Sequence, residues 1–297
     1  MENNFNTVAI LGRYADPRVA EPVTALVAHL IDAGRNVIAS RDAALESPVR
    51  IVDEQKIAVE ADLIIAVGGD GTMLYAAGLA REQSVPLLGI NRGRLGFLAD
   101  ITPDEMLNSL DQVLAGHYSR ESRLLLSAKI IAPGGSANVA AALNDVVLQR
   151  RSTGRMIDFE TRIAGRYVNT HSGDGLIVAT PTGSTAYALS CGGPIMEPGL
   201  EAVVVLPICP HTLGDRPIVI PSAYPIEVRL LPYSDARAEV TIDGHTLGDL
   251  NVDDRLLIGE SACRITLIHP PGYDYFEILR SKLHWGRDSR VRGGARD

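Results

Sequence analysis

The first 120 residues alternate between short apolar runs and longer stretches with helical spacing. The pattern predicts strands at 7–11, 36–39, 63–67 and 85–90, and helices at 22–33, 52–61, 73–81 and from 102 onward. Such alternation is typical of a parallel sheet covered by helices. Because ligands bind beyond the carboxyl ends of parallel strands, the turn after strand 63–67 is the first place to look for a site.

The hydrophobic pattern changes near residue 120, where many short apolar segments follow one another with turns between them. Strands are predicted at 124–132, 141–150, 157–165, 166–171, 175–180, 201–208, 217–220, 226–231, 238–242, 255–258 and 263–268. A short helical stretch at 184–190 interrupts them, and helical spacing returns at 273–285. The pattern favours an all-β sandwich or barrel as a second domain. The polar end of the chain, 287–297, is expected to fray.

A glycine-rich turn, Gly-Gly-Asp-Gly-Thr at 68–72, joins the buried strand 63–67 to a helix. Its glycines allow a close backbone approach, and the N–H groups that open a helix favour a phosphate. The turn is neither a Walker loop nor a dinucleotide fingerprint. Asp70 is unusual there, because a carboxylate repels phosphate unless it holds a metal or takes a proton. The alternative is a turn former or a helix cap.

Two more polar segments interrupt apolar strands of the second half. Asn144 and Asp145 are predicted to lie inside a strand, so one of them faces inward and needs a partner such as a ribose diol. An edge strand or a bulge is the alternative. A second glycine–acid turn, 172–175, leads to the hydroxyl-rich run 180–187, where Ser184 is a natural N-cap and Tyr187 offers a face for a base or packs in the core.

Composition narrows the class of protein. The chain has 297 residues, 46% hydrophobic and 22% charged, as expected for a globular protein. A formal net charge of −8 argues against non-specific nucleic-acid binding. No apolar stretch is long enough to span a membrane, and no signal peptide is recognised, so a cytoplasmic location is expected. Three well-separated cysteines are expected to be free thiols.

The motifs taken together resemble the NAD kinase family, over most of the chain. The motifs that carry the resemblance are 68–72, Asn-Arg-Gly-Arg-Leu-Gly-Phe-Leu at 91–98, Asn-Asp at 144–145, the run 172–194, Pro-His-Thr-Leu at 210–213 with Arg-Pro at 216–217, Asp-Gly at 243–244, and 279–285. The family implies an N-terminal Rossmann-like α/β domain and a sandwich-like C-terminal β domain, with the last helix returning to the first. The implied domains are 1–120 with 271–297, and 121–270.

The resemblance implies transfer of the γ-phosphoryl group of ATP to the 2′-hydroxyl of the adenosine ribose of NAD, which gives NADP and ADP. Asp70 would take the hydroxyl proton, and Mg²⁺ would neutralise the triphosphate, with no protein ligand assigned to it. The implied phosphate contacts are Gly68, Gly69, Gly71 and Thr72. The implied NAD contacts are Asp70, Gly71, Asn144, Asp145, Arg155, Ser172, Asp174, Thr185, Ala186, Tyr187, Ser190, Cys209 and His245.

Family members form homodimers or homotetramers in which a neighbouring subunit helps to line the NAD site. Ser172 stands where some members carry an arginine that bears on the preference for NAD over NADH, so this preference stays open. Two other functions remain open: a related lipid or sugar-phosphate kinase, and a non-catalytic dinucleotide-binding regulator. No nucleic-acid or membrane partner is expected.

Overall fold

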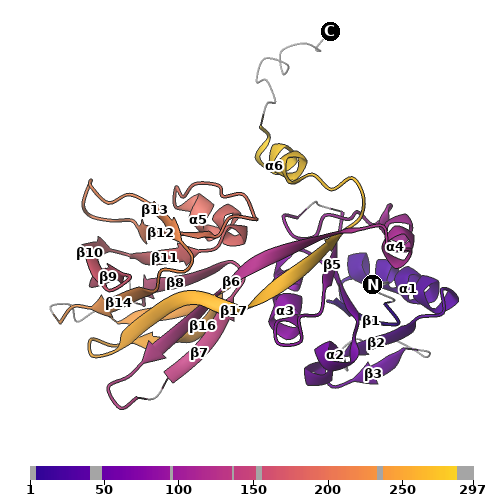
Figure 1. The fold of residues 1–297 in the computed structure, drawn as a ribbon, viewed down its shortest axis with the longest axis horizontal. Coiled ribbons are helices and arrows are strands. Elements are labelled where there is room, and N and C mark those ends of the chain that lie inside the picture. The colour runs from indigo at the N-terminus through magenta and orange to yellow at the C-terminus, as the bar shows by residue number, and fades with distance from the viewer. Residues whose placement is uncertain are drawn as a thin grey trace, which may run out of the picture. The chain divides into compact units, whose positions relative to one another are not determined.

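The computed structural model describes residues 5–40, 49–93, 96–135, 137–151, 156–232 and 237–285. The chain divides into two compact units by its contacts. Unit 1 comprises Met1–Glu121 with Leu267–Asp297, and unit 2 comprises Ser122–Thr266. The chain therefore leaves unit 1 along one strand and returns along another (Figure 1).

Unit 1 is built on a parallel sheet in the order β5-β4-β1-β2-β3. Its strands are β1 (Thr7–Gly12), β2 (Asn36–Ser40), β3 (Arg50–Val52), β4 (Leu63–Val67) and β5 (Leu87–Ile90). Every residue of β4 is buried, as its unbroken apolar run predicts. The central strands therefore hold the glycine-rich turn that follows β4 on a rigid frame.

The helices of unit 1 are α1 (Pro17–Asp32), α2 (Glu54–Glu60), α3 (Asp70–Ala80), α4 (Met106–Leu114) and α6 (Tyr275–Leu283). The prediction that the first helix begins at Pro22 is wrong. Asp16 caps α1 by accepting a hydrogen bond from the N–H of Arg18, and Pro17 occupies the first turn, so Pro22 lies inside the helix. In α6, the Lys282 ammonium lies 5.6 Å from the centroid of the Phe97 ring, which ties this helix to unit 1.

Unit 2 packs two largely antiparallel sheets face to face. One contains β10-β9-β14-β17, with β6 and β7 beside β17, and the other has the order β13-β12-β11-β8-β15-β16. The strands of the first are β6 (Ser119–Ile131), β7 (Ala137–Ala142), β9 (Ile157–Ile163), β10 (Arg166–Gly173), β14 (Ile226–Leu230) and β17 (Arg255–His269). Those of the second are β8 (Asp145–Arg150), β11 (Gly175–Ala179), β12 (Ala202–Ile208), β13 (Ile218–Pro221), β15 (Ala238–Ile242) and β16 (His245–Leu250). Alternating apolar residues of both sheets form its core.

The fold class is confirmed: an α/β unit, a sandwich-like β unit, and a C-terminal helix that belongs to the first. Two strand predictions are wrong in detail. The predicted strand 141–150 is two strands, β7 and β8, and the predicted strands 255–258 and 263–268 are one, β17. The predicted helix start at Thr102 is a turn that precedes α4, and the tail 287–297 lies outside the described residues.

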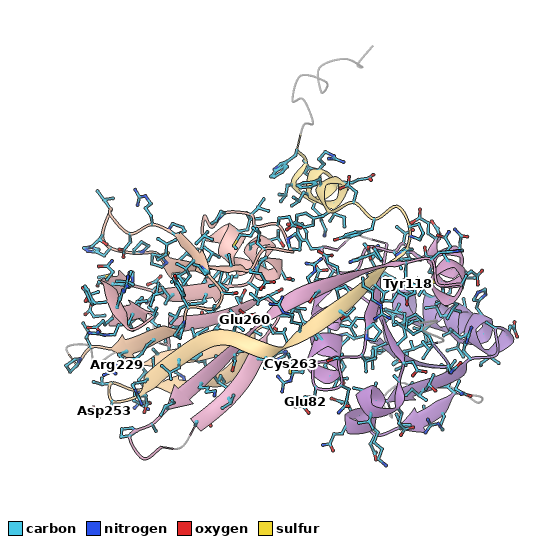
Figure 2. All side chains as sticks on the ribbon, viewed as in Figure 1. Glu82, Tyr118, Arg229, Asp253, Glu260 and Cys263 are labelled. Atoms are coloured by element: carbon cyan, nitrogen blue, oxygen red, sulfur yellow. The ribbon has the colours of Figure 1, made fainter. Side chains whose placement is uncertain are left out.

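The cysteines Cys191, Cys209 and Cys263 are all free thiols, as predicted. Figure 2 places Cys263 on β17. Among the described residues, no helix is long and apolar enough to cross a membrane.

Candidate functional site

The glycine-rich turn stands at the carboxyl edge of the sheet in unit 1. Helix α3 begins at Asp70 rather than at Met73, because the N–H groups of Thr72 and Met73 already bond to the carbonyl of Gly69. In the described part of the chain, the backbone N–H groups of Asp70 and Gly71 have no hydrogen-bond acceptor. A helix opening with free N–H groups favours an anionic ligand.

The Asp70 carboxylate does not cap its own helix. Oδ2 accepts from the N–H of Phe97 at 3.1 Å, and Oδ1 accepts from the N–H of Leu98 at 2.9 Å. A Cβ on Gly96 would overlap Asp70 Oδ1, so a side chain there would displace the carboxylate. The helix-cap alternative is therefore wrong. The carboxylate is oriented by a loop that follows β5, and each oxygen keeps a second lone pair for a ligand.

The three glycines of the turn have different roles. A Cβ on Gly68 would overlap the Thr72 side chain, which lies directly over it. A Cβ on Gly69 or Gly71 would meet nothing within 4 Å. The first glycine thus serves the packing of the turn itself, and the other two leave open space over the free N–H groups.

In unit 2, Asn144 and Asp145 do not lie inside a strand as predicted. Asn144 lies in the bend between β7 and β8, and Asp145 begins β8. The carboxylate of Asp243 forms this bend by accepting from the N–H groups of Leu143 and Asn144 at 2.8 Å and of Asp145 at 3.1 Å. Three backbone donors converge on this one side chain. The chain therefore bends here, and the predicted continuous strand is divided in two.

Asp243 is the functional residue that sequence reasoning missed. It lies with Gly244 in the two-residue turn between β15 and β16, and both residues have positive φ, 48° and 81°. This conformation is typical of Asp-Gly hairpin turns. The Asp-Gly pair was the available signal, but only the fold brings that hairpin to the bend at Asn144.

The pKa values of Asp145 and Asp243 are both raised, mainly by burial. Burial raises the pKa of Asp145 to about 7, with a contribution from the charge of Asp243. Burial also raises the pKa of Asp243, against the opposing effect of its backbone hydrogen bonds. Near neutral pH the Asp145 carboxyl group is present both as an acid and as a carboxylate. It can therefore donate to one hydroxyl and accept from another, as a ribose diol requires.

The hydroxyl-rich run packs directly on this bend. Thr180 donates to the Leu143 carbonyl at 2.5 Å and accepts from the N–H of Gly183 at 3.1 Å. A Cβ on Gly183 would overlap the backbone of Asn144. The prediction of Ser184 as an N-cap is wrong: its buried hydroxyl donates to the Pro181 carbonyl and accepts from the N–H of Met196. The run therefore packs tightly against the backbone of the bend at Asn144.

Tyr187 opens the short helix α5 (Tyr187–Ser190), and its ring is 42% exposed rather than core. Burial raises the pKa of its hydroxyl, and the nearby Cys191, Cys209 and Asp174 raise it further. The charge of Asp145 acts on Cys191 as well. These side chains therefore form one polar cluster in unit 2, with an exposed aromatic face at its edge.

The remaining predicted contacts fall into three groups. Asp174 joins the cluster but is paired with Arg150, 2.7 Å away, and exposed His245 lies close enough to Asp243 to act on its charge. No interaction connects the side chains of Ser172, Ala186 or Ser190 to the cluster within the described chain, and the Thr185 hydroxyl bonds to the Thr182 carbonyl. Arg155 lies outside the described residues.

A metal site made by the protein alone is not found among the described residues, since no group of three or more His, Cys, Asp or Glu side chains could hold an ion. Asp70 supplies one carboxylate at the turn. A single carboxylate fits Mg²⁺, which is commonly held by one or two carboxylates together with substrate phosphates.

Comparison with known proteins gives the class and then the family. The ATP-NAD kinase N-terminal domain family matches residues 33–118, and the ATP-NAD kinase C-terminal domain family matches residues 143–269. A two-domain fold with the glycine–acid turn in the first domain defines the class as a kinase, an enzyme that transfers phosphoryl groups. The chain belongs to the ATP-NAD kinase family, and the resemblance seen in its motifs is confirmed.

Curated relatives match over almost the whole chain. An NAD kinase from Aromatoleum aromaticum is 43% identical over 294 residues, 98% of this chain and 97% of the relative. One from Thiobacillus denitrificans is 44% identical over 292 residues, 97% and 99% of the two chains. The matches support an NAD kinase over a lipid or sugar-phosphate kinase and over a non-catalytic regulator.

Solved structures give the same result. A yeast NADH kinase complexed with NADH has a TM-score of 0.90 at 26% identity and covers 98% of this chain and 90% of its own. An NAD kinase from Archaeoglobus fulgidus in complex with ATP has a TM-score of 0.73 at 27% identity and covers 94% of this chain and 98% of its own.

Proposed function

We propose that the chain transfers the γ-phosphoryl group of ATP to the 2′-hydroxyl of the adenosine ribose of NAD, giving NADP and ADP. The observation that carries the proposal is Asp70, a carboxylate fixed by two backbone N–H groups in a turn whose neighbouring N–H groups are free. Phosphoryl transfer requires an acceptor for the hydroxyl proton and donors for the phosphates, and this turn offers both.

In this proposal Asp70 accepts the proton of the 2′-hydroxyl. The N–H groups of the turn bind the phosphates of ATP, and the proposed phosphate contacts are Gly68, Gly69, Gly71 and Thr72. A divalent cation such as Mg²⁺, when bound with ATP, neutralises charge on the phosphates. Asp70 is the carboxylate that this chain would contribute to it.

Most of the proposed NAD contacts lie in unit 2, whereas Asp70 and Gly71 belong to unit 1. Asn144 and Asp145 bind ribose hydroxyls, and Tyr187 offers its exposed face to a base. The other proposed contacts are Gly71, Arg155, Ser172, Asp174, Thr185, Ala186, Ser190, Cys209 and His245. Asp243 positions the bend but is not itself a proposed contact.

Three properties complete the proposal. The enzyme assembles as a homodimer or homotetramer, as its family resemblance implies, and a light-scattering mass of the purified protein tests this. It works in the cytoplasm, where its three free thiols stay reduced. Its partners are NAD and ATP, without nucleic acid or membrane.

The test is an assay of the purified protein with ATP, Mg²⁺ and NAD, in which a coupled NADP-dependent dehydrogenase reports NADP. Folded protein that forms no NADP contradicts the proposal. Initial rates with NAD and NADH side by side, and with polyphosphate in place of ATP, define the acceptor and the donor.

The ribose assignment has its own test. Asp145→Ala removes a proposed ribose partner, so KM for NAD is expected to rise about tenfold or more while KM for ATP stays within about twofold, one hydrogen bond to a charged group being worth about 1.5–3 kcal/mol. An unchanged KM for NAD contradicts the assignment.

A further inference from the structure

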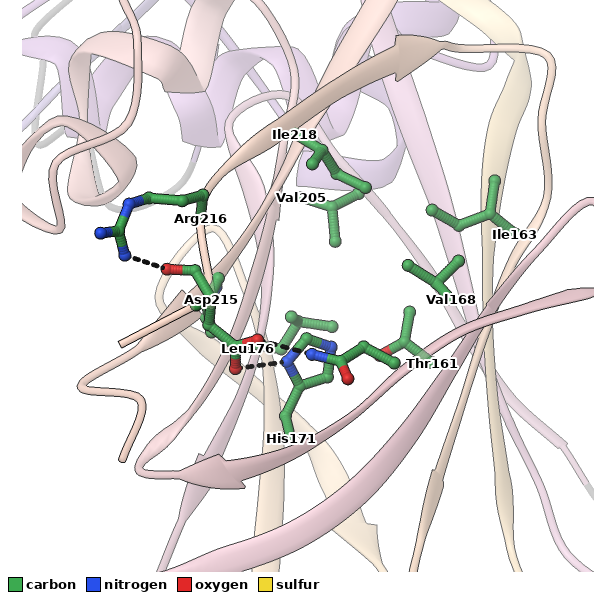
Figure 3. A pocket seen from close by; sticks show the side chains of 12 residues that line it. Thr161, Ile163, Val168, His171, Leu176, Val205, Asp215, Arg216 and Ile218 are labelled. Carbon is green, nitrogen blue, oxygen red and sulfur yellow. Dashed lines mark hydrogen bonds and ion pairs between the residues drawn. The ribbon is translucent and has the colours of Figure 1, made fainter. Parts of the chain in front are cut away.

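The charged side chains around the 240 Å³ cavity of unit 2 already have partners (Figure 3). Asp215 pairs with His171 at 2.9 Å and accepts from Asn169, and Arg216 donates to main-chain carbonyls. The described lining of this cavity therefore leaves no charge unpaired. At the carboxyl edge of the sheet in unit 1, by contrast, one cation has no partner among the described residues.

The proposed phosphate turn, 68–72, contains no Lys or Arg. A triphosphate carries several negative charges, and a bound divalent cation offsets only part of them. Guanidinium and ammonium groups form short, strong hydrogen bonds to phosphate oxygens. A cation from a neighbouring segment of unit 1 would therefore complete the phosphate site.

The sheet brings the segment after β1 next to this turn. Strands β1 and β4 are parallel neighbours, and Gly12 at the end of β1 is paired with Val67 at the end of β4. Arg13 follows Gly12, and Gly68 follows Val67. Neighbouring strands lie about 4.8 Å apart, which is less than the reach of an extended arginine side chain. Arg13 is therefore placed beside the first residue of the turn.

The faces of the sheet show on which side Arg13 lies. Val8 and Ile10 of β1 belong to the core that includes α1, and a Cβ on Gly12 would meet Val19 of that helix. Successive residues of a strand face opposite sides of a sheet. This alternation, continued by one residue, places Arg13 on the face away from α1.

Gly68 lies on the same face as Arg13, because Val67 before it packs in the core of α1. A Cβ on Gly68 would overlap Thr72, in the first turn of α3. Arg13 and the beginning of α3 therefore lie on one side of the sheet, next to each other along its carboxyl edge.

An ion pair crosses this edge above the end of β4. In the sheet, β4 lies between β5 and β1. Arg92 follows β5 and Asp16 follows β1, and Arg92 Nη1 lies 2.8 Å from Asp16 Oδ2. The loops on both sides of the phosphate turn are therefore tied together across it, and Arg13 belongs to one of them.

The positive charge of Arg13 is available to a ligand. Asp16, the acid of the same loop, is already paired with Arg18 at 2.9 Å and with Arg92. Arg13 is exposed, and its side chain has no hydrogen bond or ion pair to any described residue. Its carbonyl accepts from the N–H of Asp16 at 2.9 Å, which fixes the backbone that carries the guanidinium.

We propose that Arg13 binds the phosphates of ATP from the β1 side of the turn. A guanidinium can donate two parallel hydrogen bonds to one phosphate. The free N–H groups of Asp70 and Gly71 donate from the α3 side. The inference rests on the proposed function and adds one contact to it. It adds no covalent step.

The test measures binding of Mg²⁺–ATP to the full chain by isothermal titration calorimetry, without NAD. Arg13→Gln is expected to raise Kd about tenfold or more, because a hydrogen bond between charged groups is lost. Arg13→Lys keeps the charge but not the paired donors, and its Kd is expected to lie between the two. Arg81→Gln, at the other end of α3, loses the same charge and is expected to keep Kd within about twofold.

Kinetics separate a phosphate contact from a disturbed loop. In Arg13→Gln, KM for ATP is expected to rise about tenfold or more, while KM for NAD stays within about twofold. A melting curve confirms that each variant is folded, since the Arg13 side chain has no described partner to lose.

The inference is overturned if Arg13→Gln binds Mg²⁺–ATP as the wild type does. An equal loss of affinity in Arg81→Gln also overturns it, because overall charge would then be the cause, as does a KM for NAD that rises as much as KM for ATP. A protein that binds Mg²⁺–ATP through Arg13 but forms no NADP contradicts the proposed function alone. NADP formation with an unchanged KM for ATP in Arg13→Gln contradicts the role of Arg13 alone.

Discussion

The Asp70 side chain has a structural role and a proposed catalytic role. Its oxygens accept from the N–H groups of Phe97 and Leu98, and in the proposed mechanism one of them also takes the substrate proton. The sequence shows an acid in a phosphate-binding turn. It does not show that the acid is held by a loop 27 residues away.

Asp70→Asn is expected to lower kcat about 10²–10⁴-fold, the usual contribution of a general base. The amide group must also face one of the two backbone N–H donors, so the free energy of unfolding is expected to fall by about 1–3 kcal/mol. Steady-state kinetics and urea unfolding measure the two effects. Asp104→Asn, on the exposed surface of the same unit, is the control, and near-wild-type kcat in Asp70→Asn refutes the proton-accepting role.

Asp145 makes the stability of the protein depend on pH. Its pKa is raised to about 7 in the folded protein, from about 4 in an unfolded chain, so the folded state binds more protons between these values. The free energy of unfolding therefore falls as pH rises from about 4 to about 7.

Asp145→Asn is expected to flatten this part of the pH profile, measured as the urea midpoint from pH 4 to pH 7. The exposed Asp253 lies in the same unit, and Asp253→Asn is the control that keeps the slope (Figure 2). Because the pKa of Asp243 is raised as well, part of the slope remains, but a slope equal to that of the wild type contradicts the burial of Asp145.

At the scale of secondary-structure elements, the end of a strand depends on which group accepts the hydrogen bonds of its backbone N–H groups. Asp243 takes three N–H groups and so divides one long apolar pattern into β7 and β8. The glycine of the 3-10 helix at Thr182–Thr185 lets that element press against the resulting bend. The local pattern predicted one strand at 141–150 and a helical stretch at 184–190, but neither the bend nor its contact with the 3-10 helix.

Gly183→Ala tests that contact, because the added Cβ overlaps the Asn144 backbone. The expected cost is about 1–3 kcal/mol in the free energy of unfolding, as for other overpacked sites, with a raised KM for NAD. Gly78→Ala in α3 is the matched control, since a Cβ there meets nothing within 4 Å and the change is expected to stabilise the helix by about 0.5–1 kcal/mol. If Gly183→Ala unfolds as the wild type does, the close approach is refuted.

At the scale of the molecule, the chain passes between its units along β6 and β17, and a buried ion cluster in unit 1 holds the ends of both strands. His269 of β17 lies 2.8 Å from Asp100 and 3.1 Å from Glu121 of β6, and its ring stacks on Tyr273. Burial lowers the pKa of His269, but the hydrogen bonds and charges of the two carboxylates outweigh this and raise it.

A raised histidine pKa in the folded state stabilises the protein fully below the unfolded value of about 6.5, and this stabilisation is lost as pH rises through the folded pKa. His269→Gln is therefore expected to destabilise the protein at pH 6 and to remove the decline above pH 6.5. Urea midpoints from pH 6 to pH 9 measure it. His117→Gln, an exposed histidine of the same unit, keeps the decline. If the urea midpoints of His269→Gln depend on pH as those of the wild type do, the decline above pH 6.5 does not originate in this ion cluster.

The sequence alone determined the fold class and the family. Apolar periodicity is a local property, so the buried run of β4, the alternating strands of unit 2 and the glycine turn at Asp70 could all be located from it. The ordered set of motifs then identified the kinase family, because so many could not coincide by chance.

The tertiary structure alone decided what each polar side chain binds. Asp243 meets the bend at Asn144 across about a hundred residues, and Asp70 meets the backbone at Leu98 across 28. Arg13 likewise lies beside Gly68 only because β1 and β4 are neighbours in the sheet. Periodicity carries no information on such pairings, since hydrogen bonds and packing between distant segments depend on where the whole chain places them.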